Sequence, residues 1–358
     1  MKKSLLLISS FLMAAAIVQA KEITPAPVAV NEAPVTIVEK EVIVYRDRTP
    51  VGFKPNGNMK LEYRYYGDAE GQNHDTGWSR ENNYSRIQFS GTINVTENQR
   101  FYWRIRDWNS LDKESDRRTE NTNTQVRLRY FYDHGYLGDS KVNFTSRVHY
   151  QDGADNVQKL EYSTRFNFAE YMFNNDYAKV TNFILAPKYA YAWGGTNDDD
   201  YDNQLGMDLF ASAEFPLGFS FELNVYTAKH FYGRDRLFDG NRKLEDENFT
   251  VDVEAYLYNT QNLYTSADGK LGIDFGFEGG YDDYSWSQEK TYGSSRRDNV
   301  DYSLYALPYI QVNYQVSPNF KAFVAAGAEY RNFAVTSGKS ASHWRWQPEA
   351  WAGFNVTF

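Results

Sequence analysis

Hydrophobic and polar residues alternate with a period of two along most of the chain after residue 57. This period indicates β-strands, because successive side chains of a strand point to opposite faces. Most of the alternating segments are longer than the ~5 to 6 residues of a globular strand and reach the ~9 to 11 that cross a bilayer. We count fourteen of them: 58–67, 82–95, 100–109, 123–133, 141–150, 157–168, 179–193, 203–215, 218–230, 247–258, 269–282, 300–316, 319–331 and 345–358.

The last segment, WQPEAWAGFNVTF from Trp346 to Phe358, shows the pattern most clearly. Counting back from Phe358, every second residue is apolar, aromatic or small. A final strand leaves an open edge in a soluble sheet, whereas the closing strand of a membrane barrel pairs on both sides. The terminal Phe358 also resembles the assembly signal read by the outer-membrane barrel-assembly machinery. An ordinary last strand of a soluble sandwich is the alternative for this stretch alone.

The connections between segments alternate between short and long. Residues 96–99, 216–218 and 317–319 are tight links, whereas 68–81, 110–122, 194–202, 231–246, 283–299 and 332–344 are long and polar. Short periplasmic turns opposite long external loops are typical of outer-membrane barrels, which have an even number of strands in bacteria. The pattern therefore predicts an all-β fold: a transmembrane, antiparallel, up-and-down β-barrel of about fourteen strands over residues 58–358.

Two segments precede this barrel. Lys2 and Lys3 stand before an apolar run that ends in the small residue Ala20, which predicts a cleaved signal peptide over 1–20 and export of the rest. Residues 21–57 contain several prolines and predict an extended periplasmic leader, with a pore plug or a cell-wall contact as alternatives. After the signal no run approaches ~18 apolar residues, so we expect no membrane-spanning helix.

Composition narrows the class further. Aromatic residues make up 17% of the chain, with 29 Tyr and 24 Phe, as the interfacial girdles of a membrane barrel require. The net charge is −9 and becomes −11 once Lys2 and Lys3 are removed, which argues against a nucleic-acid partner. There is no cysteine, so disulfides and thiolate chemistry are excluded.

The strand period also predicts which charges face the lumen. We expect the pore-lining basic residues to be Arg64, Arg86, Arg104, Arg106, Arg127, Arg129, Arg147 and Arg165. We expect the pore-lining acidic residues to be Asp208, Glu214, Glu222, Asp252, Glu254, Asp274 and Glu278. Strands that follow in sequence are neighbours round a barrel, so a basic wall would face an acidic wall and set up a transverse field. Glu62 and Glu161 interrupt the basic block, and the alternative is that the lumen charges pair and brace the interior.

No motif indicates catalysis or a metal site. His149 and Ser146 lie close in sequence but on opposite strand faces, His134 falls in a predicted inner turn, and His74 and His343 fall in outer loops. The acidic stretch Asp198–Asp200 with Asp202 lacks the spacing of a calcium loop, so we expect a solvated loop there. We therefore predict no enzymatic activity, no metal and no cofactor.

Three stretches carry a resemblance to a known family. They are VIVYRDR in the leader, PNGNMKLEYRYYG from Pro55 onward and AWAGFNVTF at the C-terminus. Together with the long Tyr-rich strands between them, they resemble the fusobacterial major outer-membrane porins of the FomA type. The resemblance implies a voltage-sensitive general-diffusion porin, which is oligomeric and whose exposed loops are linked to adhesion.

The sequence thus predicts a protein of the bacterial outer membrane that passes small hydrophilic solutes and ions through a water-filled lumen. A barrel with a closed or plugged lumen that acts as an adhesin through loop aromatics such as Trp78 and Phe231 is the alternative. The loops 231–246 and 283–299 are the candidates for narrowing the pore. The expected partners are membrane lipids, the assembly machinery, solutes, surface ligands of the loops, and further copies in a trimer. An outer face of small residues is a candidate subunit contact, with relief of crowding at barrel closure as the alternative: Ala322, Ala326, Ala328, Ala350 and Ala352.

Overall fold

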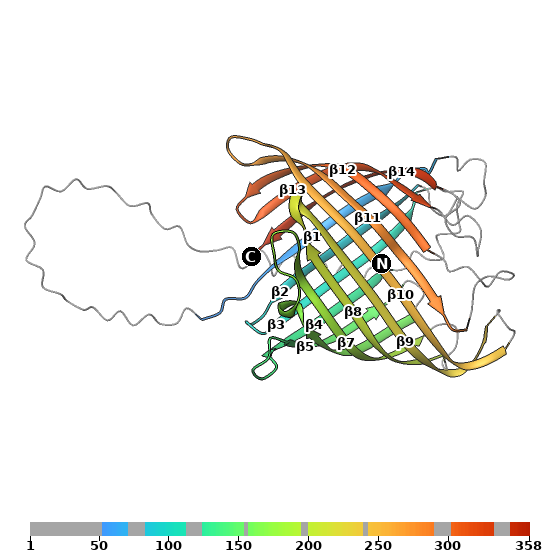
Figure 1. The fold of residues 1–358 in the computed structure, drawn as a ribbon. Helices are drawn as coiled ribbons and strands as arrows, with labels where there is room; N and C mark the ends of the chain where they lie inside the picture. The colour runs from blue at the N-terminus through green and yellow to red at the C-terminus, as the bar shows by residue number, and fades with distance from the viewer. Residues whose placement is uncertain are drawn as a thin grey trace, which may run out of the picture. The chain divides into compact units, whose positions relative to one another are not determined.

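The computed structural model describes residues 52–70, 83–111, 124–153, 157–194, 200–238, 243–289, 302–332 and 344–358. Its residues from Pro55 to Thr357 form one compact unit, an antiparallel β-barrel that closes on itself (Figure 1). Within these ranges, no helix is long and apolar enough to cross a membrane. The predicted signal peptide lies outside the described residues, as does nearly all of the leader.

The barrel has fourteen strands, as the alternation predicted. Two single-turn 3₁₀ helices, η4 (Ala169–Tyr171) and η5 (Pro216–Gly218), lie in the links after β6 and β8. The strands are β1 (Asn56–Tyr66), β2 (Tyr84–Asn94), β3 (Gln99–Ser110), β4 (Gln125–Tyr136), β5 (Asn143–Asp152), β6 (Val157–Asn167), β7 (Lys179–Gly194), β8 (Asp202–Glu214), β9 (Phe219–Phe238), β10 (Lys243–Thr265), β11 (Leu271–Ser287), β12 (Tyr302–Ser317), β13 (Phe320–Asn332) and β14 (Trp344–Thr357).

Each strand pairs with its two neighbours in sequence, and the ring closes between β1 and β14. In that closing pair Asn58 lies opposite Thr357 and Tyr66 lies opposite Glu349. The C-terminal stretch therefore pairs on both sides, with β1 and with β13, as the sequence predicted for a closing strand. Because the strands alternate in direction, the links after the even-numbered strands all lie at the barrel end where β14 finishes (Figure 1).

The two faces of the strands differ as a membrane barrel requires. Large apolar side chains on one face are widely exposed, for example Met207 at 54%, Val324 at 54% and Leu205 at 52%. On the other face of the same barrel, Glu62, Glu161 and Asp208 are at most 3% exposed. A soluble protein would reverse this distribution, so the outer face suits lipid and the inner face encloses the polar groups.

Part of the interior is filled by apolar side chains. Leu307 on β12, Phe323 on β13 and Trp351 on β14 are buried on the inner face and form one cluster, with Tyr309 packed against it. The rings of Tyr309 and Trp351 meet edge to face with centroids 5.1 Å apart. Gly276 on β11 makes room for this packing, because a Cβ there would lie 2.0 Å from the Tyr309 ring. The lumen is therefore narrowed along β12–β14.

Two predictions about the outer end of the barrel are wrong. The segment 231–246 was expected to be a loop, but β9 continues to Phe238 and β10 starts at Lys243, so most of it is a paired hairpin. Phe231 is consequently a strand residue opposite Glu247, and the described part of this stretch is paired strand, while residues 239–242 lie outside the described residues. The segment 283–299 likewise begins as strand, since β11 extends to Ser287.

The reason for both errors is the length of these strands. β9 has 20 residues and β10 has 23, more than the ~9 to 11 that a bilayer needs. Past the apolar band a strand can carry charges on both faces, so its alternation disappears while its hydrogen bonding continues. Arg234, Asp235 and Arg236 follow one another on β9, so charges lie on both faces of the strand there, and the two arginines reach Asp200, at 3.1 and 3.2 Å.

Candidate functional site

The inner face of the barrel is the candidate site, because the charged side chains gather there. The strand alternation observed in the structure places all eight predicted basic and all seven predicted acidic residues on this face. Their surroundings differ, and they fall into a paired group and an unpaired group. Ion pairs within 4.0 Å define the first group.

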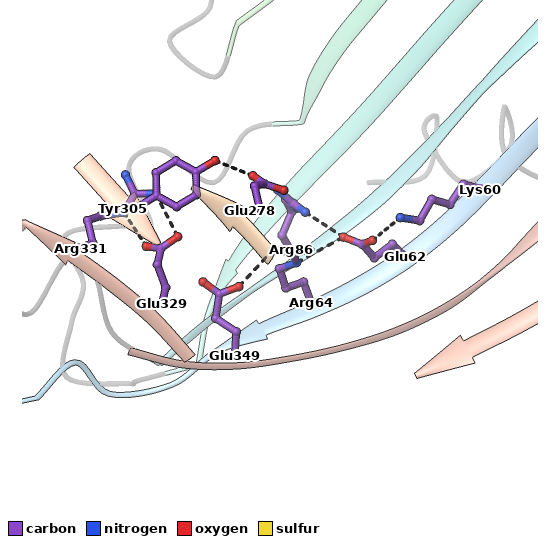
Figure 2. A network of polar contacts seen from close by, with 9 residues as sticks. All are labelled: Lys60, Glu62, Arg64, Arg86, Glu278, Tyr305, Glu329, Arg331 and Glu349. Atoms are coloured by element: carbon purple, nitrogen blue, oxygen red, sulfur yellow. Dashed lines mark hydrogen bonds and ion pairs between the residues drawn. The ribbon is translucent and has the colours of Figure 1, made fainter. Parts of the chain in front are cut away.

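The first paired cluster lies at the closing seam, across β14, β1 and β2 (Figure 2). Glu62 stands at its centre, with Lys60 Nζ at 2.6 Å, Arg86 Nη2 at 2.9 Å and Arg64 Nε at 3.4 Å. Arg64 also reaches Glu349 on β14 at 3.2 Å. Glu62 and Glu349 are almost fully buried, so these contacts compensate the cost of removing two carboxylates from water.

Figure 2 shows two further contacts beside this seam cluster. Tyr305 on β12 donates its hydroxyl to Glu278 on β11 at 2.6 Å. Arg331 and Glu329, two residues apart on β13, form an ion pair at 2.5 Å. The seam region is thus held by a mixture of charged and neutral contacts.

The second paired cluster lies on β5 to β8. Arg147 on β5 forms an ion pair with Glu161 on β6, and Lys188 on β7 lies 2.6 Å from Asp208 on β8. Both pairs are sealed from solvent: the exposed fractions are 4% for Arg147, 3% for Glu161 and 1% for Asp208. Ala186 on β7 is fully buried among them, which shows that this part of the interior is tightly packed.

The sequence pattern predicted most of the charged residues of the two paired clusters as pore-lining, but it did not predict with which residues they form ion pairs. Lys188 was absent from the predicted lining, as were Lys60 and Glu349. Strand parity alone could have placed Lys188 on the inner face, because Asp208 and Lys188 lie at inward positions of adjacent strands. The ion pairs remove Arg64, Arg86 and Arg147 from any unpaired basic wall, and they remove Asp208 from the acidic one.

The unpaired basic residues lie mainly on β3 and β4. None of them has a carboxylate within 4.0 Å among the described residues, and all are half-buried rather than sealed. Arg106 donates to Gln88 at 2.6 Å, and Arg127 donates to Gln151 at 3.4 Å. These residues, hereafter the arginine wall, are Arg104, Arg106, Arg127 and Arg129, with Arg165 on β6 beside them.

The remaining predicted acidic residues of the lumen lie on β9, β10 and β11. They accept hydrogen bonds from neutral groups: Ser285 donates to Asp252 at 2.5 Å, and Asn313 donates to Asp274 at 2.6 Å. All are half-buried, like the arginines. These residues, hereafter the acidic wall, are Glu222, Asp252, Glu254, Asp274 and Glu278. Glu214, also predicted for this wall, instead lies exposed at the end of β8 and pairs with Lys179 at 3.4 Å.

The two walls lie opposite each other in the ring. β3 and β10 are seven strands apart in either direction round the fourteen, and so are β4 and β11. The buried ion pairs of β5–β8 and the apolar cluster of β12–β14 fill the sides between them. Partly exposed charge therefore remains on two facing sides of the interior.

Of the described histidines, His134 and His230 each lie in a small polar cluster, and that of His134 is on the outer face. His134 was predicted in a turn, but β4 extends to Tyr136, and His134 Nε2 lies 2.9 Å from Ser146 Oγ on β5. Ser146 also contacts the Tyr162 hydroxyl at 3.1 Å. Within the described ranges, no carboxylate contacts the other ring nitrogen of His134. His149 points inward instead, away from Ser146, as parity predicted.

The second histidine cluster lies inside the outer end of the barrel. His230 Nδ1 lies 2.7 Å from Asp202, and its Nε2 lies 2.9 Å from the Thr250 hydroxyl. The described part of the chain contains no group of three or more acidic or histidine side chains that could hold a metal ion. Of the predicted acidic loop, Asp198 and Asp199 lie outside the described residues, as do His74, His343 and Trp78.

The alanines predicted to form a face of small residues lie on the outer surface. Ala350 and Ala352 on β14 are exposed, and Ala350 pairs with Ala326 of β13. Val324, which lies opposite Ala352, is 54% exposed. This face is therefore apolar and open to lipid or to another subunit. Phe358 directly follows β14.

No family model matches the sequence, and no curated protein is similar to it. Solved structures of outer-membrane proteins are similar over most of the chain. OmpT, an outer membrane protein of Vibrio cholerae, is 11% identical with a TM-score of 0.36, over 85% of this chain and 97% of that one. The outer membrane channel DcaP of Acinetobacter baumannii is 10% identical with a TM-score of 0.37, over 86% and 99%. The NanC porin is 6% identical with a TM-score of 0.33, over 83% and 98%.

Proposed function

We propose that this protein is a porin of the bacterial outer membrane, and that small hydrophilic solutes and ions diffuse through its lumen. The observation that carries the proposal is the pair of facing walls: partly exposed guanidinium groups on β3–β4, and partly exposed carboxylates on β9–β11 that accept hydrogen bonds from neutral groups. Partly exposed charges of one sign, gathered on one side of the interior, are stable only where water reaches them, since a dry interior would require each charge to be compensated.

The mechanism follows from the arrangement of these walls. Cationic guanidinium groups on one side and carboxylates on the other create a field across the path of the solute. Such a field orients dipolar solutes and excludes apolar ones, because charges facing a confined lumen act more strongly than charges in bulk water. Passage is passive, without a catalytic step or a cofactor.

The architecture outside the lumen supports the same proposal. A closed ring of strands leaves no unpaired backbone edge in lipid, and the outer face is widely apolar. We assign residues 1–20 to a cleaved export signal and the following leader to the periplasm. The resemblance to FomA-type porins adds voltage sensitivity and a trimeric assembly to the proposal.

Single-channel recording of the refolded protein in a planar bilayer tests the proposal. We expect discrete conductance steps of stable size, and a reversal potential under a salt gradient that reports which wall dominates permeation. A correctly folded barrel that produces no steps would refute the porin function. That result would favour the adhesin alternative, to be tested by deleting the loops between the strands and measuring binding of cells to surface ligands.

A further inference from the structure

The four arginines of β3 and β4 occupy adjacent positions, and no carboxylate of the described residues lies between them to offset their repulsion. Arg104 lies directly opposite Arg127 in the strand pairing, and Arg106 and Arg129 occupy the diagonal positions. Side chains directly opposite in an antiparallel pair have Cβ atoms ~5 Å apart, and like charges there destabilise the sheet. In contrast, Arg64 and Arg86, which also lie directly opposite each other, share Glu62 between them.

These guanidinium groups also hold unused hydrogen-bond donors. Arg127 Nε and Arg129 Nε are buried and have no hydrogen-bond partner within the described ranges, and neither does Arg165 Nη1. Arg104 forms no hydrogen bond or ion pair with any described residue. A polar group left in this state costs free energy unless another molecule supplies the acceptor. The molecule that would do so carries several oxygen acceptors and negative charge.

The four residues are all arginines, which limits the chemical class of the ligand that they could bind. All four positions carry a guanidinium, whose planar fork binds carboxylate and phosphate with two parallel hydrogen bonds, whereas a lysine offers a point charge. Positions two apart on a strand are separated by ~7 Å, so the four side chains form a small grid rather than a single point. A dianionic tetrahedral group has enough oxygens to bridge several forks at once.

We propose that Arg104, Arg106, Arg127 and Arg129 form a binding subsite for phosphate and phosphate monoesters inside the lumen. The subsite lies on the inner face, so its ligand is a solute rather than a lipid headgroup. The inference rests on the proposed porin function, because the ligand reaches the subsite by entering the lumen. It adds selectivity to that function: the channel favours phosphorylated solutes over neutral ones of equal size.

The test compares two double variants that remove the same charge. Arg104→Gln with Arg127→Gln removes the directly opposed pair. The matched control, Lys60→Gln with Arg100→Gln, removes two positive charges from the inner face of β1 and β3 but leaves the grid intact. Glu62 keeps Arg64 and Arg86 in this control, so its burial remains compensated.

Two readouts separate the subsite from the channel. In bilayers, inorganic phosphate or glucose phosphate at constant ionic strength should block the chloride current of the wild type. The grid variant should need about tenfold more phosphate for the same block, and the control less than about twofold more. In detergent, phosphate should raise the melting temperature of the wild type and the control more than that of the grid variant, after subtraction of the effect of sodium chloride at the same ionic strength.

The possible outcomes are distinct. Loss of block and of stabilisation in the grid variant alone supports the subsite. An equal loss of block and of stabilisation in both double variants would show that phosphate responds only to the total positive charge of the lumen, and it would overturn the inference. A wild type that conducts but is neither blocked nor stabilised by phosphate would also overturn it. A wild type without conductance steps that is still stabilised by phosphate through the grid would refute the porin function and leave the subsite standing.

Discussion

Two regions of the barrel interior differ in how their charged side chains are paired and exposed. On β5–β8, Arg147 with Glu161 and Lys188 with Asp208 are paired and sealed from water. On β3–β4 and β9–β11, arginines and carboxylates stand on separate sides and remain half-exposed. An inward-facing charge in a barrel is therefore not by itself a pore residue. A charge that is paired and buried stabilises the fold, whereas a charge that is separated from its counter-charges and partly exposed is one that we propose to act on solutes.

The largest effect should come from breaking a buried pair. Glu161→Gln leaves the Arg147 guanidinium buried without its carboxylate, which should lower the free energy of unfolding by about 3 to 5 kcal/mol. Urea unfolding of the refolded barrel in detergent measures this change. The double variant Arg147→Met with Glu161→Leu should recover most of the loss, because it removes the buried guanidinium together with its carboxylate, and Lys159, which also lies within 4.0 Å of Glu161, is 30% exposed and can reach water. A single variant as stable as the wild type would contradict the structural role of the pair.

An intermediate effect should come from reversing the charge of the arginine wall. Arg127→Glu with Arg129→Glu places negative charge on both sides of the lumen, so cations should permeate more easily. We expect the cation-to-anion permeability ratio to rise by about threefold or more. Reversal potentials in a salt gradient measure it, and values equal to those of the wild type would show that solutes do not pass this wall.

The smallest effect on stability should come from neutralising the acidic wall. Asp274→Asn keeps the side-chain shape beside Asn313, and the carboxylate it replaces is half-exposed with neutral partners. We expect the free energy of unfolding to change by less than about 1 kcal/mol, with a modest shift of the reversal potential towards anions. A loss as large as that of Glu161→Gln would remove the distinction between the two regions.

The strands were predictable from the sequence because a membrane barrel repeats one simple pattern. Each predicted segment matches a strand, and parity alone orders the faces: Met207 outward and Asp208 inward illustrate it on β8. The prediction failed where lipid no longer imposes the pattern, in the outer parts of β9 and β10 and at His134 near the inner end of β4.

The pairing of the lumen charges was beyond the reach of the sequence pattern. Parity says that Arg147 and Glu161 share a face, but their contact depends on the register of β5 against β6, where Arg147 lies opposite Ser163. Register is fixed by hydrogen bonding between strands and by turn geometry, which one-dimensional alternation does not contain. The difference between the region of buried ion pairs on β5–β8 and the regions of separated charges on β3–β4 and β9–β11 can therefore be seen only in the structure.

The closing pair between β1 and β14 affects how the barrel folds. Asn58 and Thr357 meet in this pair although they stand almost at opposite ends of the barrel sequence. Contacts between such distant positions form late and slowly, because the chain must first give up the entropy of a very long loop. Until β14 arrives, β1 and the newest strand both present bare edges, which are templates for aggregation. We therefore expect the protein to need binding partners that shield these edges until the barrel closes.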